Sequence, residues 1–348
     1  MQPMLLSVAV VIAVLAAGVM GYAIQRGATC TVAAVDELLT RRKARRLLAM
    51  AEASLWVAGG LALAHVLHAL PAMPAAYPLS GWVFAGAVLL GFGAWVNGAC
   101  VFGAIARFGS GDVNYVATPL GFYAGCLSVD ALFGAPAASR LAAVSPVLQA
   151  SGLAALAFVV FAVWRTVPPL VRTAFGPRDE PQRSALGASL AARVWAPHAA
   201  TGVIGVTFVI ILVLVGAWAY TDVLAQLAHG MSMRLVLGIV FLLALFAGAL
   251  VGGWTAGRLR PTAPTLRGTV RCFAGGVLMA WGSLLIPGSN DGLILIGMPL
   301  LYPYAWLAFA TMCVTIAAAM LLSRRLAARR RGESSQFDHE HDGAPHAS

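Results

Sequence analysis

Long apolar stretches separated by short polar or basic segments run along almost the whole chain. A helix needs about 20 apolar residues to cross a bilayer, and most of these stretches approach or exceed that length. Nine of them are candidate membrane spans: residues 4–24, 47–69, 82–97, 116–134, 146–165, 200–220, 232–253, 269–286 and 302–322. The pattern therefore predicts an all-α polytopic membrane protein with about nine transmembrane helices.

Two of the apolar stretches carry an internal repeat. Residues 84–103 read FAGAVLLGFGAWVNGACVFG and residues 273–292 read FAGGVLMAWGSLLIPGSNDG, so glycines recur at a constant offset and Cys100 corresponds to Ser289. In both copies Gly, Asn or Pro breaks the apolar run just before this position, and a similar break precedes Cys30. Interrupted helices at matching places in two halves of a chain are typical of a transport site near the bilayer midplane. We expect short re-entrant half-helices to begin near Cys30, Cys100 and Ser289.

Composition excludes a soluble protein. Of the 348 residues, 60% are hydrophobic and only 10% are charged, and the mean hydropathy is +0.84. The net charge of +10 could suggest a nucleic-acid partner, but the Lys and Arg residues lie in short clusters between apolar runs, where the positive-inside rule accounts for them. The five cysteines show no C-x-x-C spacing, so we expect neither a disulfide framework nor a metal site.

Basic clusters indicate the orientation and the division of the chain. They lie at residues 40–46, 165–193, 258–271 and 324–331, with an even number of predicted spans between each and the next. All four can therefore face the cytoplasm, together with the C-terminus. We expect two pseudo-symmetric halves, whose repeats could be inverted or parallel. The predicted parts are an N-terminal transmembrane half (1–165), a basic cytoplasmic linker (166–199), a C-terminal transmembrane half (200–323) and a disordered cytoplasmic tail (324–348).

The break before Cys100 offers a thiol in a dry constriction. Asn97 and Gly98 end the preceding apolar run, so backbone N–H groups can approach the sulfur and a new helix can begin there. A polarisable sulfur makes weak hydrogen bonds to a sulfur-containing anion without a large desolvation cost when the anion leaves. The same reasoning applies to Cys30. The alternative for both is a small buried residue between packed helices, which is a common place for a free cysteine.

Ser289 takes the position of Cys100 in the second copy of the repeat, between Gly288 and Asn290. Its hydroxyl donates a better hydrogen bond than a thiol does, but it is a poorer match to sulfur. Asp291 follows, and an acidic group at membrane depth is costly enough to indicate a role in gating, coupling or helix capping. We expect Gly288, Ser289 and Asn290 to line the same path as Asn97, Gly98 and the two cysteines.

Two arginines lie close to the cysteine breaks. Arg26 precedes Cys30 and could attract an anion to the mouth of a path, or it could simply extend to the membrane interface. Arg107 follows Cys100 and could form a structural ion pair with Asp112 at the end of the short helix, or it could make a vestibule attractive to anions. We therefore treat both as candidates for anion attraction or gating.

Three glycine-rich segments also carry a resemblance to a known family. They are GYAIQRGATCTVAAVDELL, GFGAWVNGACVFGAIARFGSGD, and GGWTAGRLRPTAP followed by FAGGVLMAWGSLLIPGSNDG. With these segments the chain resembles the YeeE/YedE (thiosulfate transporter, TsuA-like) family of membrane proteins. The resemblance implies an hourglass-shaped helical carrier or channel for thiosulfate, with three path-lining cysteines and a soluble cytoplasmic sulfur-carrier partner. The first two family cysteines match Cys30 and Cys100, whereas the third falls at Ser289, so a related sulfur anion is an alternative substrate.

The sequence thus predicts a transporter in the bacterial inner membrane that imports a small inorganic sulfur anion, most simply thiosulfate. We expect no enzyme activity and no cofactor, and the absence of G-x-x-x-x-G-K-[ST] leaves a gradient or metabolic trapping as the energy source. One alternative is a membrane thiol oxidoreductase, although the chain has no C-x-x-C motif. Another is a non-transporting scaffold or sensor of sulfur metabolism.

Overall fold

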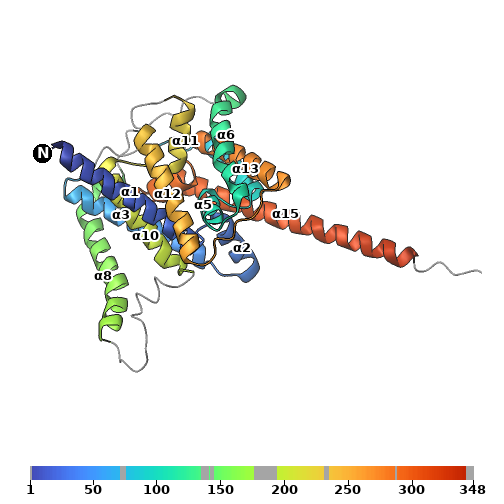
Figure 1. Cartoon of the computed structure of the whole chain (residues 1–348), viewed down its shortest axis with the longest axis horizontal. Coiled ribbons are helices and arrows are strands. Elements are labelled where there is room, and N and C mark those ends of the chain that lie inside the picture. Colours follow the sequence, from blue (N-terminus) through green and yellow to red (C-terminus); the bar gives the residue numbers. More distant parts are fainter. Residues whose placement is uncertain are drawn as a thin grey trace, which may run out of the picture.

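A computed structural model of the chain describes residues 2–70, 76–134, 141, 145–175, 194–230, 235–286 and 288–341. Within these residues the regular structure is helical, with two isolated bridges between extended residues (Figure 1). Eight helical segments of this described part are long and apolar enough to cross a membrane, and a shorter apolar helix occupies Ser151–Val167. The predicted all-α polytopic membrane fold is confirmed.

The N-terminal half contains two long helices that are each followed by a short one. α1 (Gln2–Gly27) leads into α2 (Thr31–Arg41), and α4 (Gly81–Asn97) leads into α5 (Val101–Gly109). The other elements of this half are α3 (Arg45–Val66), the 3₁₀ helix η1 (Val113–Val116), α6 (Ala117–Phe133), α7 (Pro146–Gln149) and α8 (Ser151–Phe175). The last of these helices extends past residue 165, into the segment expected to be a linker.

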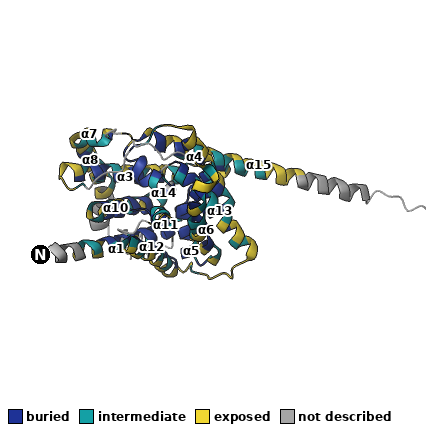
Figure 2. Ribbon diagram, turned by 90° about the horizontal axis from the view of Figure 1, so that it is seen from above, coloured by how far each residue is buried: buried dark blue, intermediate teal, exposed yellow. Residues whose placement is uncertain are grey.

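The C-terminal half repeats this order. α10 (Pro197–Val215) is followed by the short α11 (Tyr220–Ala228), and α13 (Leu266–Leu285) by α14 (Asn290–Gly292) and the π-helical turn η2 (Leu293–Gly297). The remaining helices are α12 (Leu235–Thr255) and α15 (Pro303–His341). α15 projects from the body of the molecule in both views and continues beyond residue 324, where a disordered tail was expected (Figures 1 and 2).

The two halves interlock through equivalent helices, with α4 packed along α13 and α1 along α10. Gly86 faces Gly282, and Gly93 faces Gly275. The repeat offset relates Gly86 to Gly275 and Gly93 to Gly282. Exchanging the two repeats therefore turns the contact of Gly86 with Gly282 into the contact of Gly275 with Gly93. Residue numbers rise along α4 while they fall along α13, which makes the equivalent helices antiparallel. From sequence the repeats could be either inverted or parallel. The structure shows that they are inverted, as in many secondary transporters.

Burial follows the requirements of a lipid environment. Buried residues gather where the short helices meet the long ones, and the outward faces expose large apolar side chains (Figure 2). Leu153, Val236 and Trp254 are each at least 70% exposed in the isolated chain. Such side chains suit contact with lipid, whereas the breaks between long and short helices require protein around them, because lipid cannot satisfy their free backbone groups. The chemically interesting residues thus lie at the centre of the molecule.

Candidate functional site

Cys30 and Cys100 meet where two short helices begin. Cys30 directly precedes α2 and Cys100 directly precedes α5, as the sequence predicted. The backbone N–H of Thr31 donates a hydrogen bond to Cys100 Sγ at 3.1 Å, which brings Cys100 next to the residue that follows Cys30. Both cysteines are free and buried, with Cys100 fully inaccessible. A Cβ placed on Gly103 would lie 2.4 Å from Cys30 Sγ, so only glycine allows α5 to approach this thiol.

Asn97 holds the loop that presents Cys100. α4 ends at Asn97, and Gly98 then adopts a left-handed conformation with φ 74°, which glycine tolerates without strain. The Asn97 side-chain amide donates to Ala99 O at 2.7 Å, and its side-chain oxygen accepts from Thr118 Oγ1 at 3.0 Å. Tyr115 OH also donates to Asn97 O at 3.2 Å. Asn97 is fully buried, so it positions the loop from behind.

Removing the Asn97 amide should expose the Cys100 thiol. Asn97→Ala loses two side-chain hydrogen bonds of about 1 kcal/mol each, which favours local opening of the loop about tenfold or more. We expect Cys100 to react with a maleimide at least about tenfold faster, measured by mass spectrometry of labelled peptides. Thr118→Val, which removes one of the two bonds, should give a smaller increase. An unchanged rate in Asn97→Ala would contradict this positioning role.

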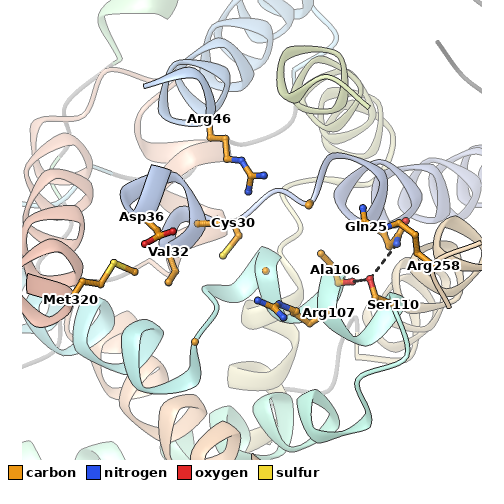
Figure 3. Close-up of a pocket in the computed structure, with 14 residues that line it drawn as sticks. Gln25, Cys30, Val32, Asp36, Arg46, Ala106, Arg107, Ser110, Arg258 and Met320 are labelled. Carbon is orange, nitrogen blue, oxygen red and sulfur yellow. Dashed lines mark hydrogen bonds between the residues drawn. The ribbon is translucent and has the colours of Figure 1, made fainter. Parts of the chain in front are cut away.

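A cavity of about 620 Å³ opens beside Cys30. Its lining includes the guanidinium groups of Arg46, Arg107 and Arg258, which come from α3, from α5 and from the chain just after α12 (Figure 3). Among the described residues of this lining, Asp36 on α2 is the one acidic residue. The cavity thus carries an excess of positive charge at its wall and a thiol at its inner surface, which favours anions.

A second cavity, of about 310 Å³, has Ser289 in its wall. Gly288 and Gly292 flank it, and Thr221 and Asp222 of α11 lie opposite. Thr221 Oγ1 lies within hydrogen-bonding distance of Ser289 Oγ. The hydroxyl groups and the glycine backbone can form hydrogen bonds with a small ligand, although most of the cavity wall is apolar.

Cys100 lies between the two cavities and lines neither of them. On one side it contacts Thr31, next to Cys30. On the other side α5 packs against α14, the helix that begins beyond Ser289, and Tyr220 lies within electrostatic range of both Cys100 and Asp291. Ser289 thus lines the smaller cavity and Cys30 the larger one, while Cys100 is buried next to Thr31.

The other predicted site residues fall in different places. Arg107, Gly98 and Gly288 line the cavities, whereas Asp291 is buried behind Ser289. Arg26 is 2% exposed and lines neither cavity. Its guanidinium donates to Tyr22 OH at 2.8 Å and to Thr255 Oγ1 at 2.9 Å, and it lies over the Tyr22 ring. It therefore joins α1 to α12. Asn290 begins α14, and its side chain lies outside the described residues.

Thr221 and Asp222, which bring a hydroxyl and a carboxyl group to the smaller cavity, were missed from sequence. They belong to α11, which begins at Tyr220, the last residue of the predicted span 200–220, and the sequence predicted no helix beyond it. Gly216, with φ 103°, ends α10 early and lets the chain restart as a short helix. A glycine in an apolar run, followed within a few residues by an acidic residue, was the signal that could have shown this fourth break. Among the described residues no cluster of three or more His, Cys, Asp or Glu side chains could hold a metal ion.

Comparison with known proteins identifies a family. No curated protein matches the chain. The model of the sulphur transport family matches residues 26–318, a range that contains Cys30, Cys100, Ser289 and nearly all the helices described above. A multi-pass membrane fold with an inverted repeat agrees with a transport role. The chain belongs to the sulphur transport family, the YeeE/YedE family of membrane proteins.

Proposed function

We propose that this protein imports thiosulfate along a path formed in order by Ser289, Cys100 and Cys30. The observation that carries the proposal is that all three residues directly precede short helices, with Ser289 in the wall of a small cavity, Cys30 in the wall of a basic one and Cys100 buried beside Thr31. A sulfur anion that passes these residues would lose water molecules and gain weak hydrogen bonds from their hydroxyl and thiol groups. Such bonds are weak enough for the anion to leave again. The backbone N–H groups at the helix starts add partial positive charge.

The arginines of the larger cavity support a direction of transport. Basic clusters mark the cytoplasmic side of bacterial membrane proteins, and Arg46 and Arg258 belong to two of the basic clusters. Arg324, from a third cluster, pairs with Asp36 of the same cavity at 2.6 Å. We infer an inner-membrane protein whose larger cavity and C-terminus face the cytoplasm. The smaller cavity is then the entrance, and a soluble sulfur-carrier protein could dock at the basic exit.

A second candidate function, membrane thiol oxidation, draws support from one contact. Cys100 Sγ accepts a hydrogen bond from Thr31, the neighbour of Cys30, and a redox enzyme could join two cysteines placed this way as a disulfide. Differential labelling during turnover separates the two functions, because a conduit keeps both thiols free and an oxidoreductase cycles them. A non-transporting scaffold or sensor would instead show no flux in proteoliposomes.

The direct test is growth of a thiosulfate-uptake-deficient bacterium on thiosulfate as its sole sulfur source. We expect the parent chain to restore growth, and Ser289→Cys to change the uptake rate by about tenfold or less, because a thiol replaces one hydrogen-bond donor by a weaker one. Membrane levels of both proteins are measured by immunoblot. If the well-expressed parent fails to restore growth but Ser289→Cys succeeds, the path serves a different anion.

A further inference from the structure

The carboxyl group of Asp291 accepts hydrogen bonds from two hydroxyl groups of the entrance cavity, one of which belongs to Ser289. Asp291 Oδ1 accepts a hydrogen bond from Ser289 Oγ, and Thr221 Oγ1 donates to the same oxygen at 2.8 Å. The backbone N–H of Gly292 donates to it as well, at 3.1 Å. Asp291 is 2% exposed and does not itself line the cavity, whereas Ser289 and Thr221 do. The two hydroxyl groups therefore separate a buried carboxyl from the space where an anion would enter.

Counting protons shows that an ionised Asp291 and a bound anion compete for the same donor. Each hydroxyl has one proton, and an ionised carboxylate can only accept hydrogen bonds. If Ser289 turned its O–H toward an anion, its lone pairs would face the carboxylate, and two like charges would lie on either side of one oxygen atom in a poorly solvated place. A protonated carboxyl removes both problems, because its own O–H donates to a neighbouring hydroxyl oxygen and frees the Ser289 proton for the anion.

Among the described residues of the cavity wall there is no positive charge that could neutralise Asp291. The residues that line the smaller cavity include no Lys, Arg or His. Among the described residues, the titratable groups that line the cavity or lie near Asp291 are Tyr77, Tyr220, Asp222 and Tyr304. None of these is a cation, and Asp222 adds a second carboxyl to the cavity wall. A proton is therefore the cation that these groups can accept when a dianion arrives.

We propose, building on the function proposed above, that capture of the sulfur dianion at Ser289 requires one proton on Asp291. The proton comes from water of the entrance cavity, binds a carboxylate oxygen and reverses the hydrogen bond between Asp291 and Ser289. No bond other than the O–H bond is made or broken, and no electron moves. Anion capture at the entrance is thus linked to proton binding.

The test is the initial rate of radiolabelled thiosulfate uptake into proteoliposomes at fixed internal pH, with external pH varied from about 5 to about 8. Thiosulfate remains a dianion over this range, so its own charge does not change. We expect parent uptake to fall about tenfold per pH unit above its midpoint, as one required proton dictates. Asp291→Asn should remove this slope, because the amide N–H₂ donates without needing a proton. Asp222→Asn is the matched control and should keep the slope.

The outcomes separate this inference from the proposed function. Uptake that falls in the parent but equally steeply in Asp291→Asn would overturn the linkage while leaving thiosulfate transport intact. So would loss of the slope in Asp222→Asn alone, because the proton would then bind the other carboxyl. Absence of parent uptake at every pH would overturn transport itself and the linkage with it. Flat uptake in Asp291→Asn beside sloping uptake in Asp222→Asn is the supporting result.

Discussion

Replacing Cys100 by alanine should nearly abolish thiosulfate uptake. Cys100 is fully buried between the two cavities, and an anion that has left one cavity has no route around it in the proposed path. Loss of its thiol leaves a desolvated anion without a partner at this point, which costs about 2 to 3 kcal/mol. That cost corresponds to a reduction of roughly 30- to 150-fold in the rate of passage. Initial uptake by cells or proteoliposomes measures it directly.

Two further variants give this experiment its meaning. Cys126→Ala is the matched control, because Cys126 is also buried but belongs to α6 and lines neither cavity. It should retain uptake within about twofold of the parent. Cys100→Ser keeps a donor but loses the polarisable sulfur, and we expect an intermediate rate. If Cys100→Ala carried thiosulfate as fast as Cys126→Ala does, the central thiol would not belong to the path.

The sequence predicted most of the architecture because a bilayer enforces it. Only helices long enough to cross lipid satisfy their backbone groups there, so apolar stretches translate directly into the observed spans. The breaks at Cys30 and Cys100 were predictable for the same reason, since Gly and Asn interrupt otherwise continuous apolar runs. Gly98, with its left-handed backbone, shows the physical basis of one such signal.

Other features depend on contacts that no local pattern contains. The inverted sense of the repeats became visible through the contacts of Gly86 with Gly282 and of Gly93 with Gly275. Arg26 looked like a candidate for attracting anions, yet its hydrogen bond to Thr255 depends on how α12 packs against α1. Thr221 and Asp222 also come from a distant part of the chain, and only tertiary structure brings them to Ser289.

The stability of the fold should depend strongly on the close contact between α4 and α13. A Cβ added at Gly282 would lie 2.5 Å from Gly86 O and 2.5 Å from Leu90 N, both of which are backbone atoms that cannot move alone. Gly282→Ala must therefore force the two equivalent helices apart, at an expected cost of about 3 kcal/mol or more. Because the inverted repeat relates Gly282 to Gly93, whose added Cβ would lie 2.8 Å from Met279 N, Gly93→Ala should cause a similar loss.

The melting temperature of detergent-solubilised protein, with the yield of monodisperse material, measures this cost. Gly81→Ala is the matched control: it makes the same chemical change at the start of α4, where an added Cβ meets nothing within 4 Å. Alanine also favours a helix over glycine, so this control should be as stable as the parent or slightly more stable. The expected difference between the two melting temperatures arises because glycine packs closely against backbone at Gly282 but not at Gly81. In lipid the hydrophobic effect does not drive helices together, so membrane helices rely on such close packing of small residues. A melting temperature for Gly282→Ala within about one degree of the Gly81→Ala value would mean that the two halves do not depend on this contact.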